Sequence, residues 1–208
     1  MEKYRSKNII AVTFCILVLL SILIIPLIKT EKEIKVYDNT IRLHVIANSD
    51  DESDQDLKLH VRDEILKYVS GFISSKDSFS ESEAMIRTRL NNIKRISENT
   101  VDNYGYNYPV EVRLEEEYYP TCEYEGVRLP EGRYTSLKVM IGEAEGHNWW
   151  CVLYPALCTS TAKPQKELTQ AGFTEEEIRI LTESEDPEYK IKFKIIELFS
   201  EIVEKFKR

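Results

Sequence analysis

Residues 142–158 read Gly-Glu-Ala-Glu-Gly-His-Asn-Trp-Trp-Cys-Val-Leu-Tyr-Pro-Ala-Leu-Cys, and we expect the fold to be organised around them. The stretch holds both tryptophans, one of the three histidines and two of the four cysteines of the chain. Tryptophan burial contributes strongly to cores and interfaces, and glycine adopts backbone angles that other residues avoid. The apolar run from Trp149 to Tyr154 predicts a strand, which Pro155 ends.

Three segments before this stretch alternate between apolar and polar residues, which is typical of strands with one buried face. The first, residues 41–47, places its apolar residues on one side and Arg42 and His44 on the other. The other two segments are residues 108–114 and 134–141. We expect the polar side of the first strand to face solvent.

Apolar residues recur at helical spacing in residues 54–69, 80–99 and 188–207, and a short helix is expected to begin after Thr174. Capping boxes, in which a serine and an acidic residue three positions later satisfy backbone amides, are expected at Ser49/Glu52, Ser53/Asp56 and Ser80/Glu83. The element order predicts an α+β fold. One domain, residues 41–160, would pack a mainly antiparallel sheet against two or more amphipathic helices, and residues 161–208 would form a C-terminal helical extension.

The N-terminus has the pattern of a membrane segment. Residues 9–28 carry no charge, and their length is about what is needed to cross a bilayer core of roughly 30 Å. Three basic residues precede the run, so the positive-inside rule predicts a cytoplasmic N-terminus and export of the remainder. We predict a signal anchor or a cleaved signal peptide in residues 1–30, with the anchor favoured because the run lacks small residues at its end. Residues 31–40 are expected to form a linker.

The charge distribution argues against nucleic-acid binding. The formal net charge is −8, and residues 1–30 carry +3, which leaves −11 on residues 31–208. Such an acidic body is repelled by phosphates, and no basic stripe with interleaved aromatic residues is present. Glu115, Glu116 and Glu117 are expected to be a solvated edge rather than a metal cluster, because no histidine accompanies them. We predict no cofactor and no metal.

The cysteines leave two hypotheses open. Export permits disulfides, and Cys151 and Cys158 are a natural pair because only six residues separate them, which leaves Cys122 over. Alternatively, the three exported thiols are reduced and buried. A separate enzymatic hypothesis has Cys151 act as a nucleophile with His147 as its base. Against this enzymatic alternative, a strand from Trp149 onward would hold the two groups more than ~10 Å apart.

Several uncommon motifs occur in a specific order. Residues 41–50 read Ile-Arg-Leu-His-Val-Ile-Ala-Asn-Ser-Asp and are followed by Gln55, Leu57, Lys58, Val61, Arg62 and Asp63. Tyr119-Pro-Thr121, the Pro-Glu-Gly-Arg-Tyr turn at residues 130–134 and residues 142–158 come next. Over roughly residues 40–160 the chain closely resembles the stage II sporulation protein R family of endospore-forming bacteria, although Cys122 is not part of that pattern.

The resemblance implies a signalling function rather than catalysis. Members of this family are made in the forespore and exported across its membrane into the space between the two membranes. There they activate a membrane-embedded aspartic protease, which processes the precursor of a sporulation sigma factor. The resemblance supplies no catalytic residues. An anchored envelope-binding module is a further alternative.

On this hypothesis the surface that contacts the protease is expected to combine the turn after the first strand with the start of the tryptophan-containing strand. The candidate contact residues are Arg42, His44, Asn48, Asp50, Gly146, His147, Asn148 and Trp149. At least one of the two tryptophans is expected to be part of the core.

Overall fold

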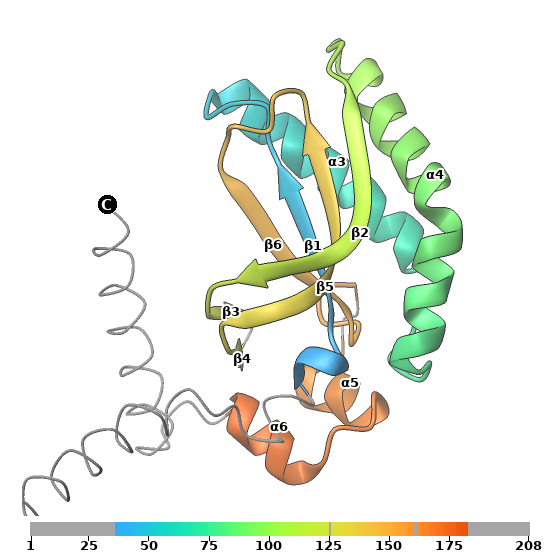
Figure 1. Cartoon of the computed structure of the whole chain (residues 1–208), viewed down its shortest axis with the longest axis vertical. Coiled ribbons are helices and arrows are strands. Elements are labelled where there is room, and N and C mark those ends of the chain that lie inside the picture. The colour runs from blue at the N-terminus through green and yellow to red at the C-terminus, as the bar shows by residue number, and fades with distance from the viewer. Residues whose placement is uncertain (1–35, 125, 160–161, 183–208) are drawn as a thin grey trace, which may run out of the picture. The chain divides into compact units, whose positions relative to one another are not determined.

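The alternating segments lie side by side in one sheet of the computed structural model, together with the strand that contains both tryptophans (Figure 1). Among the described residues the strand order of this sheet is β2-β5-β1-β6, where the strands are β1 (Ile41–Ile46), β2 (Val110–Tyr119), β5 (Gly132–Ile141) and β6 (Asn148–Tyr154). β1 is parallel to β5, whereas β1–β6 and β2–β5 are antiparallel pairs. The prediction of an α+β fold with a mainly antiparallel sheet is confirmed.

The structure describes residues 36–124, 126–159 and 162–182. The apolar segment at residues 9–28 and the helix predicted at residues 188–207 lie outside this part of the chain. Within the described part, no helix combines the length and the hydropathy that crossing a membrane requires.

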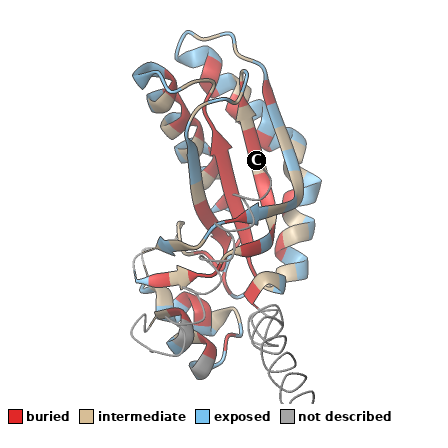
Figure 2. Ribbon diagram, turned by 60° about the vertical axis from the view of Figure 1, so that its left-hand side comes forward, coloured by how far each residue is buried: buried red, intermediate tan, exposed pale blue. Residues whose placement is uncertain are grey.

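Two long helices, α3 (Glu52–Val69) and α4 (Phe79–Asn103), cover one face of the sheet (Figures 1 and 2). Their buried apolar residues follow the helical spacing of the sequence and include Leu57, Val61, Ile65, Ile86 and Ile93. They pack against Leu43 and Val45 of β1 in one core. Each fully buried side chain of this kind contributes about 1.5–3 kcal/mol to folding, so the amphipathic pattern is sufficient to place both helices.

The predicted helix starts are wrong in detail. α4 begins with a capping box formed by Ser78 and Glu81, two residues before the predicted pair. At α3 the N-cap residue is Asp51, whose side chain makes no capping hydrogen bond. Ser49 instead donates a hydrogen bond of 2.7 Å from its hydroxyl to the Asp54 carboxylate, which removes it from the capping role that its spacing predicted.

β1 is buried on both faces, which corrects the prediction that Arg42 and His44 face solvent. Arg42 is 0% exposed and His44 is 6% exposed. The alternation correctly placed Ile41, Leu43 and Val45 on the helix-covered side. It could not reveal that segments distant in the sequence cover the second face as well.

The cover of the second face comes from a small hairpin, β3 (Cys122–Tyr124) and β4 (Val127–Leu129), and from the short helices α5 (Pro164–Gln170) and α6 (Glu175–Thr182). β2 and β5 curve toward the hairpin in Figure 1. A second core forms here, with Tyr119, Tyr134, Val152, Leu168 and Phe173 among its buried residues. The hairpin was not predicted, because strands of three residues leave no usable periodicity.

The ends of the described unit pack into the same second core. Val36 is 5% exposed, and the Tyr37 hydroxyl donates a hydrogen bond of 2.8 Å to the Glu131 carbonyl oxygen. Val36 and Tyr37, which lie inside the segment that we expected to be a linker, are therefore part of the folded unit. The prediction that Thr174 caps the short helix is confirmed, since its hydroxyl accepts a hydrogen bond of 3.3 Å from Glu177 N–H and its own N–H donates one of 2.7 Å to the Glu177 carboxylate.

Cys151 and Cys158 form a disulfide, as one of the two cysteine hypotheses predicted. It closes the segment after β6, where the Cys158 N–H also donates a hydrogen bond of 3.3 Å to the Val152 carbonyl oxygen. Cys122 is a free cysteine and is partly exposed. The sulfur of Cys151 is buried and bonded, so the hypothesis of a Cys151 nucleophile is wrong.

Candidate partner-contact site

The turn after β1 and the loop between β5 and β6 meet at one end of the sheet, the upper end in Figure 1. Two backbone hydrogen bonds of 3.1 Å join them, from Gly146 N–H to the Ala47 carbonyl oxygen and from Glu145 N–H to the Asn48 carbonyl oxygen. The Asn48 side chain adds a third link, because its Oδ1 accepts a hydrogen bond of 3.0 Å from Glu143 N–H. The two segments that carry the sequence motifs are thus one structural unit.

Asp54, in the first turn of α3, binds this unit and is 3% exposed. Its carboxylate accepts hydrogen bonds of 2.8 Å from Asn48 Nδ2 and 2.7 Å from the Ser49 hydroxyl. Burial by itself would raise the pKa of Asp54, but these hydrogen bonds outweigh it and hold the pKa below its ordinary value. The ionised Asp54 carboxylate therefore fixes the Asn48 side chain, which in turn binds the loop at Glu143.

A second support comes from Lys58, which is 4% exposed. Its ammonium donates hydrogen bonds of 2.9 Å to the His147 carbonyl oxygen and 2.5 Å to Gln55 Oε1. Gln55 Nε2 in turn donates a hydrogen bond of 2.8 Å to the Ser49 carbonyl oxygen. Burial lowers the pKa of Lys58. Turn, helix and loop are cross-linked by groups that leave little freedom for independent movement.

The outer surface of the unit presents polar and aromatic side chains. The exposed Asp50 carboxylate accepts a hydrogen bond of 2.7 Å from His147 N–H and also contacts His147 Nδ1. Asn148 is exposed, and Trp149 is 36% exposed with the Arg62 guanidinium 4.2 Å from its ring centroid. Such an arrangement suits protein contact, since aromatic and arginine side chains dominate interface energetics.

Most of the predicted contact residues come together here. Asp50, His147, Asn148 and Trp149 are exposed, and Asn48 and Gly146 are partly buried links between the two segments. Arg42 and His44 lie on the covered face of β1 and cannot touch a partner in this conformation. Trp150 is partly buried against the second core, as expected for at least one tryptophan.

His44 nevertheless connects the buried face to the site. Its Nδ1 lies 2.9 Å from both carboxylate oxygens of Glu117, and its Nε2 lies 2.8 Å from Oδ1 of Asn148. Lys138 donates a hydrogen bond of 2.8 Å to the same Glu117 carboxylate. The prediction that Glu115, Glu116 and Glu117 form a solvated edge is therefore wrong at Glu117, where a histidine and a lysine distant in the sequence supply the partners.

The Glu117 network should make folding sensitive to acid. Burial by itself would raise the pKa of Glu117, but the hydrogen bonds and charges of His44 and Lys138 lower it from 4.5 to about 2. A carboxyl group whose pKa is depressed by folding stabilises the protein above its unfolded pKa and loses that contribution as the pH falls through the folded value. We expect Glu117→Gln to reduce the free energy of unfolding at pH 7 by on the order of 2 kcal/mol.

Urea unfolding of the purified protein in detergent, measured between pH 7 and pH 2, checks this expectation. The difference between wild type and Glu117→Gln should be constant above about pH 5 and shrink toward pH 2. Glu116→Gln, at an exposed position on the same strand, is the matched control and should follow the wild type throughout. A difference that persisted unchanged at pH 2 would assign the loss to packing instead of charge.

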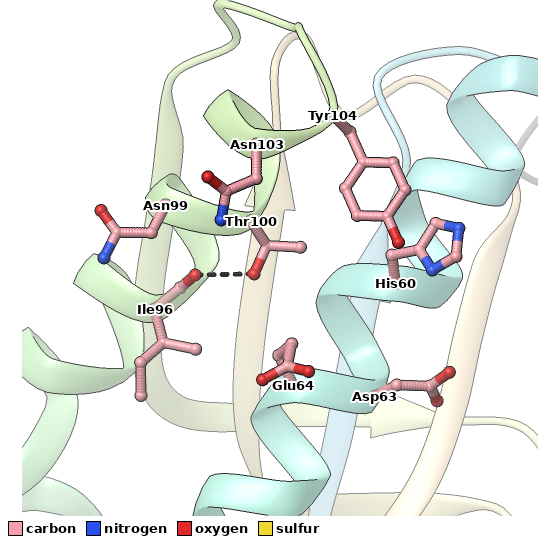
Figure 3. Close-up of a pocket in the computed structure, with 8 residues that line it drawn as sticks. All are labelled: His60, Asp63, Glu64, Ile96, Asn99, Thr100, Asn103 and Tyr104. Carbon is pink, nitrogen blue, oxygen red and sulfur yellow. Dashed lines mark hydrogen bonds between the residues drawn. The ribbon is translucent and has the colours of Figure 1, made fainter.

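Two further observations on the described residues concern metal binding and a cleft. No group of three or more His, Cys, Asp and Glu side chains within them is arranged to hold a metal ion. A separate cleft of about 480 Å³ lies between α3 and α4, where the rings of His60 and Tyr104 stack with centroids 4.1 Å apart (Figure 3). None of the predicted contact residues lines this cleft.

Sequence reasoning missed the supporting role of Asp54, Lys58 and Glu117. For the first two a signal was present, because helical spacing traced backward from Ile65 through Val61 leads to Lys58 and then to Asp54. Polar residues on the buried stripe of a helix need partners, and this requirement points toward a neighbouring loop. No comparable signal marks Glu117, whose partners lie on strands that only the fold brings together.

Comparison with known proteins finds the same family that the sequence motifs resemble. A family model described as Stage II sporulation protein R (spore_II_R) matches residues 37–164, a range that contains every residue of the contact site. The chain is 33% identical over 159 residues to a protein of Bacillus subtilis (strain 168) named Stage II sporulation protein R, which covers 73% of this chain and 71% of that protein. No solved structure matches the chain significantly. The chain belongs to the stage II sporulation protein R family.

Proposed function

We propose that this protein is an exported sporulation signal that activates a membrane-embedded aspartic protease, which then processes the precursor of a sporulation sigma factor. On this proposal the chain is made in the forespore, crosses its membrane by means of residues 9–28 and acts in the intermembrane space as a ligand. The observation that carries the proposal is the family match over residues 37–164, which contains every strand of the sheet, both long helices and the contact site.

The geometry of the contact site supports a binding role. Asp50, His147, Asn148 and Trp149 are exposed on a turn and a loop that are cross-linked to α3 by buried hydrogen bonds. A surface that is already ordered loses little conformational entropy when a partner binds. Side chains from two segments distant in the sequence are displayed together on one surface.

Forespore expression of single variants tests the proposal. Asn148→Ala should reduce sigma-factor processing about tenfold or more, the effect of losing roughly 1.4–2 kcal/mol at a central contact. Asn91→Ala, at an exposed position on α4 outside the site, is the matched control and should process normally. Immunoblots must find equal amounts of each exported protein.

The outcome of this experiment separates the proposed roles. Normal processing by both variants would exclude Asn148 from the signal. If forespore expression of the wild-type protein left the precursor unprocessed in a strain that lacks the native signal, activation itself would be wrong. Binding to envelope material would then become the better hypothesis.

A further inference from the structure

The atoms that face the ring nitrogens of His44 are oxygens, and each oxygen only accepts hydrogen bonds. Nδ1 is 2.9 Å from both carboxylate oxygens of Glu117, and Nε2 is 2.8 Å from the Oδ1 oxygen of Asn148. A neutral imidazole has one N–H and one lone pair, so it can satisfy only one of these contacts. The imidazolium, with two N–H donors, satisfies both. The arrangement around a side chain that is 6% exposed thus matches the charged form.

The charges facing His44 favour the same form. Glu117 on β2 is the direct carboxylate partner, and Lys138 on β5 bridges Glu117 and Glu115 at 2.8 and 3.7 Å. When His44 carries both ring protons, its charge and that of Lys138 balance the two carboxylates, Glu115 and Glu117. Arg42, the other charge on this face of β1, is held against tyrosine rings and does not contact Glu117 within the described residues.

The protonation state of His44 decides whether the Asn148 amide presents its oxygen or its NH2 group to the outside. Because Oδ1 points inward to His44 Nε2, the Nδ2 amide points the other way. Asn148 is exposed, and its Nδ2 has no partner among the described residues. The surface therefore presents two N–H donors at this position. A neutral His44 with its proton on Nδ1 would instead require the amide to rotate by half a turn and to present oxygen.

We propose that His44 is a positioning residue of the contact site, and that as an imidazolium it holds the Asn148 amide with its N–H donors toward a carbonyl or carboxylate oxygen of the partner. This inference rests on the proposed function, because it assigns a recognition chemistry to the same surface. His44 is buried on β1, so its exposure alone does not suggest a role in the contact site. His44 acts through Asn148 and touches no partner itself.

The Asn148→Asp variant separates the two edges of the amide. Aspartate keeps an oxygen that accepts from His44 Nε2–H, but its outward atom is a second acceptor in place of the N–H donors. We expect Asn148→Asp to lose sigma-factor processing to the same extent as Asn148→Ala, about tenfold or more. Its urea midpoint should be equal to or above that of the wild type, because the aspartate pairs with a cation.

Nitrogen NMR of the full-length protein in detergent micelles reports on His44 directly. With histidine labelled at both ring nitrogens, wild-type His44 should show two protonated nitrogens at the pH of the processing assay. Glu117→Gln removes the facing charge, so one His44 nitrogen should lose its proton in that variant. The Asn148 side-chain amide should then exchange more slowly with water, because it turns inward to donate.

The results distinguish this inference from the proposed function. A wild-type His44 with a single protonated nitrogen overturns the inference, and so does normal processing by Asn148→Asp when Asn148→Ala fails; in both cases the activator role stands. Normal processing by both Asn148 variants overturns the contact role of this residue and the inference with it. If Glu117→Gln does not fold, sigma-factor processing by Asn148→Asp still tests the inference about the Asn148 amide.

Discussion

Gly146→Ala is expected to lower the free energy of unfolding by roughly 2–4 kcal/mol and to abolish signalling. A Cβ at this position would lie 2.1 Å from the carbonyl oxygen of Ser49 and 2.6 Å from its carbonyl carbon. Both are backbone atoms of the turn, so no side-chain rotation relieves the overlap. The turn cannot withdraw without breaking the hydrogen bonds that join Ala47 and Asn48 to the loop. Asp50 and His147 would then separate.

Gly105→Ala is the matched control for this prediction. Gly105 has φ +82° and nothing within 4 Å of an added Cβ, so its replacement costs only the backbone strain of about 1–2 kcal/mol. For a domain of this size 1 kcal/mol corresponds to about 2–4 °C in Tm, and Gly146→Ala should therefore lower Tm by roughly 5–15 °C. Thermal unfolding of both variants measures the difference. Equal Tm values would mean that the turn and the loop do not approach this closely in solution.

Gly146 also illustrates what the sequence can predict about the site. The resemblance paired the segments at residues 41–50 and 142–158, and the structure joins them. The sequence does not say which backbone Gly146 approaches. That information depends on the register between β1 and β6, in which Ile46 pairs with Asn148. A pair of motifs therefore predicts that two segments are neighbours, whereas the atoms that meet follow only from strand pairing.

The helix boundaries show a different limit. Ser78/Glu81 and Ser80/Glu83 have the same capping-box spacing, so local sequence cannot choose between them. The structure uses the earlier pair, which brings Phe79 into the helix and against the core, with its ring 6.4 Å from that of Tyr154. Tertiary packing thus selects one of two equivalent caps, and that choice was not available from the periodicity.

A second large effect is expected at Arg42, where truncation and volume-conserving replacement should differ sharply. Arg42→Ala should cost about 3–5 kcal/mol, because it leaves a cavity in the second core. The guanidinium carbon lies 3.9 Å from the ring centroid of Tyr119 and 4.9 Å from that of Tyr134. These two tyrosines are 0% and 1% exposed, so water cannot fill the gap without being surrounded by aromatic surface.

Arg42→Met should be within about 1.5 kcal/mol of the wild type, because methionine fills a similar volume and needs no hydrogen bonds. The wild-type charge is itself expensive here: Nη2 contacts the Tyr124 hydroxyl, while Nε and Nη1 have no hydrogen-bond partner among the described residues. Replacing a buried ion by an apolar side chain of similar size is often neutral or stabilising. Interactions of the cation with the tyrosine faces offset part of its desolvation cost, so the sign of the Arg42→Met effect measures which of the two is larger.

Urea unfolding of both Arg42 variants, together with sigma-factor processing, separates packing from recognition. Arg95→Ala, at an exposed position on α4, should change stability by no more than about 0.5 kcal/mol. If Arg42→Met folds stably and signals normally, Arg42 is a packing residue and leaves the set of contact candidates. If it folds as stably as the wild type but fails to signal, the guanidinium must become accessible when the protease binds, which would require the β3–β4 hairpin to move away from Tyr119. Stability alone would miss that distinction, because both outcomes leave the second core intact in the free protein.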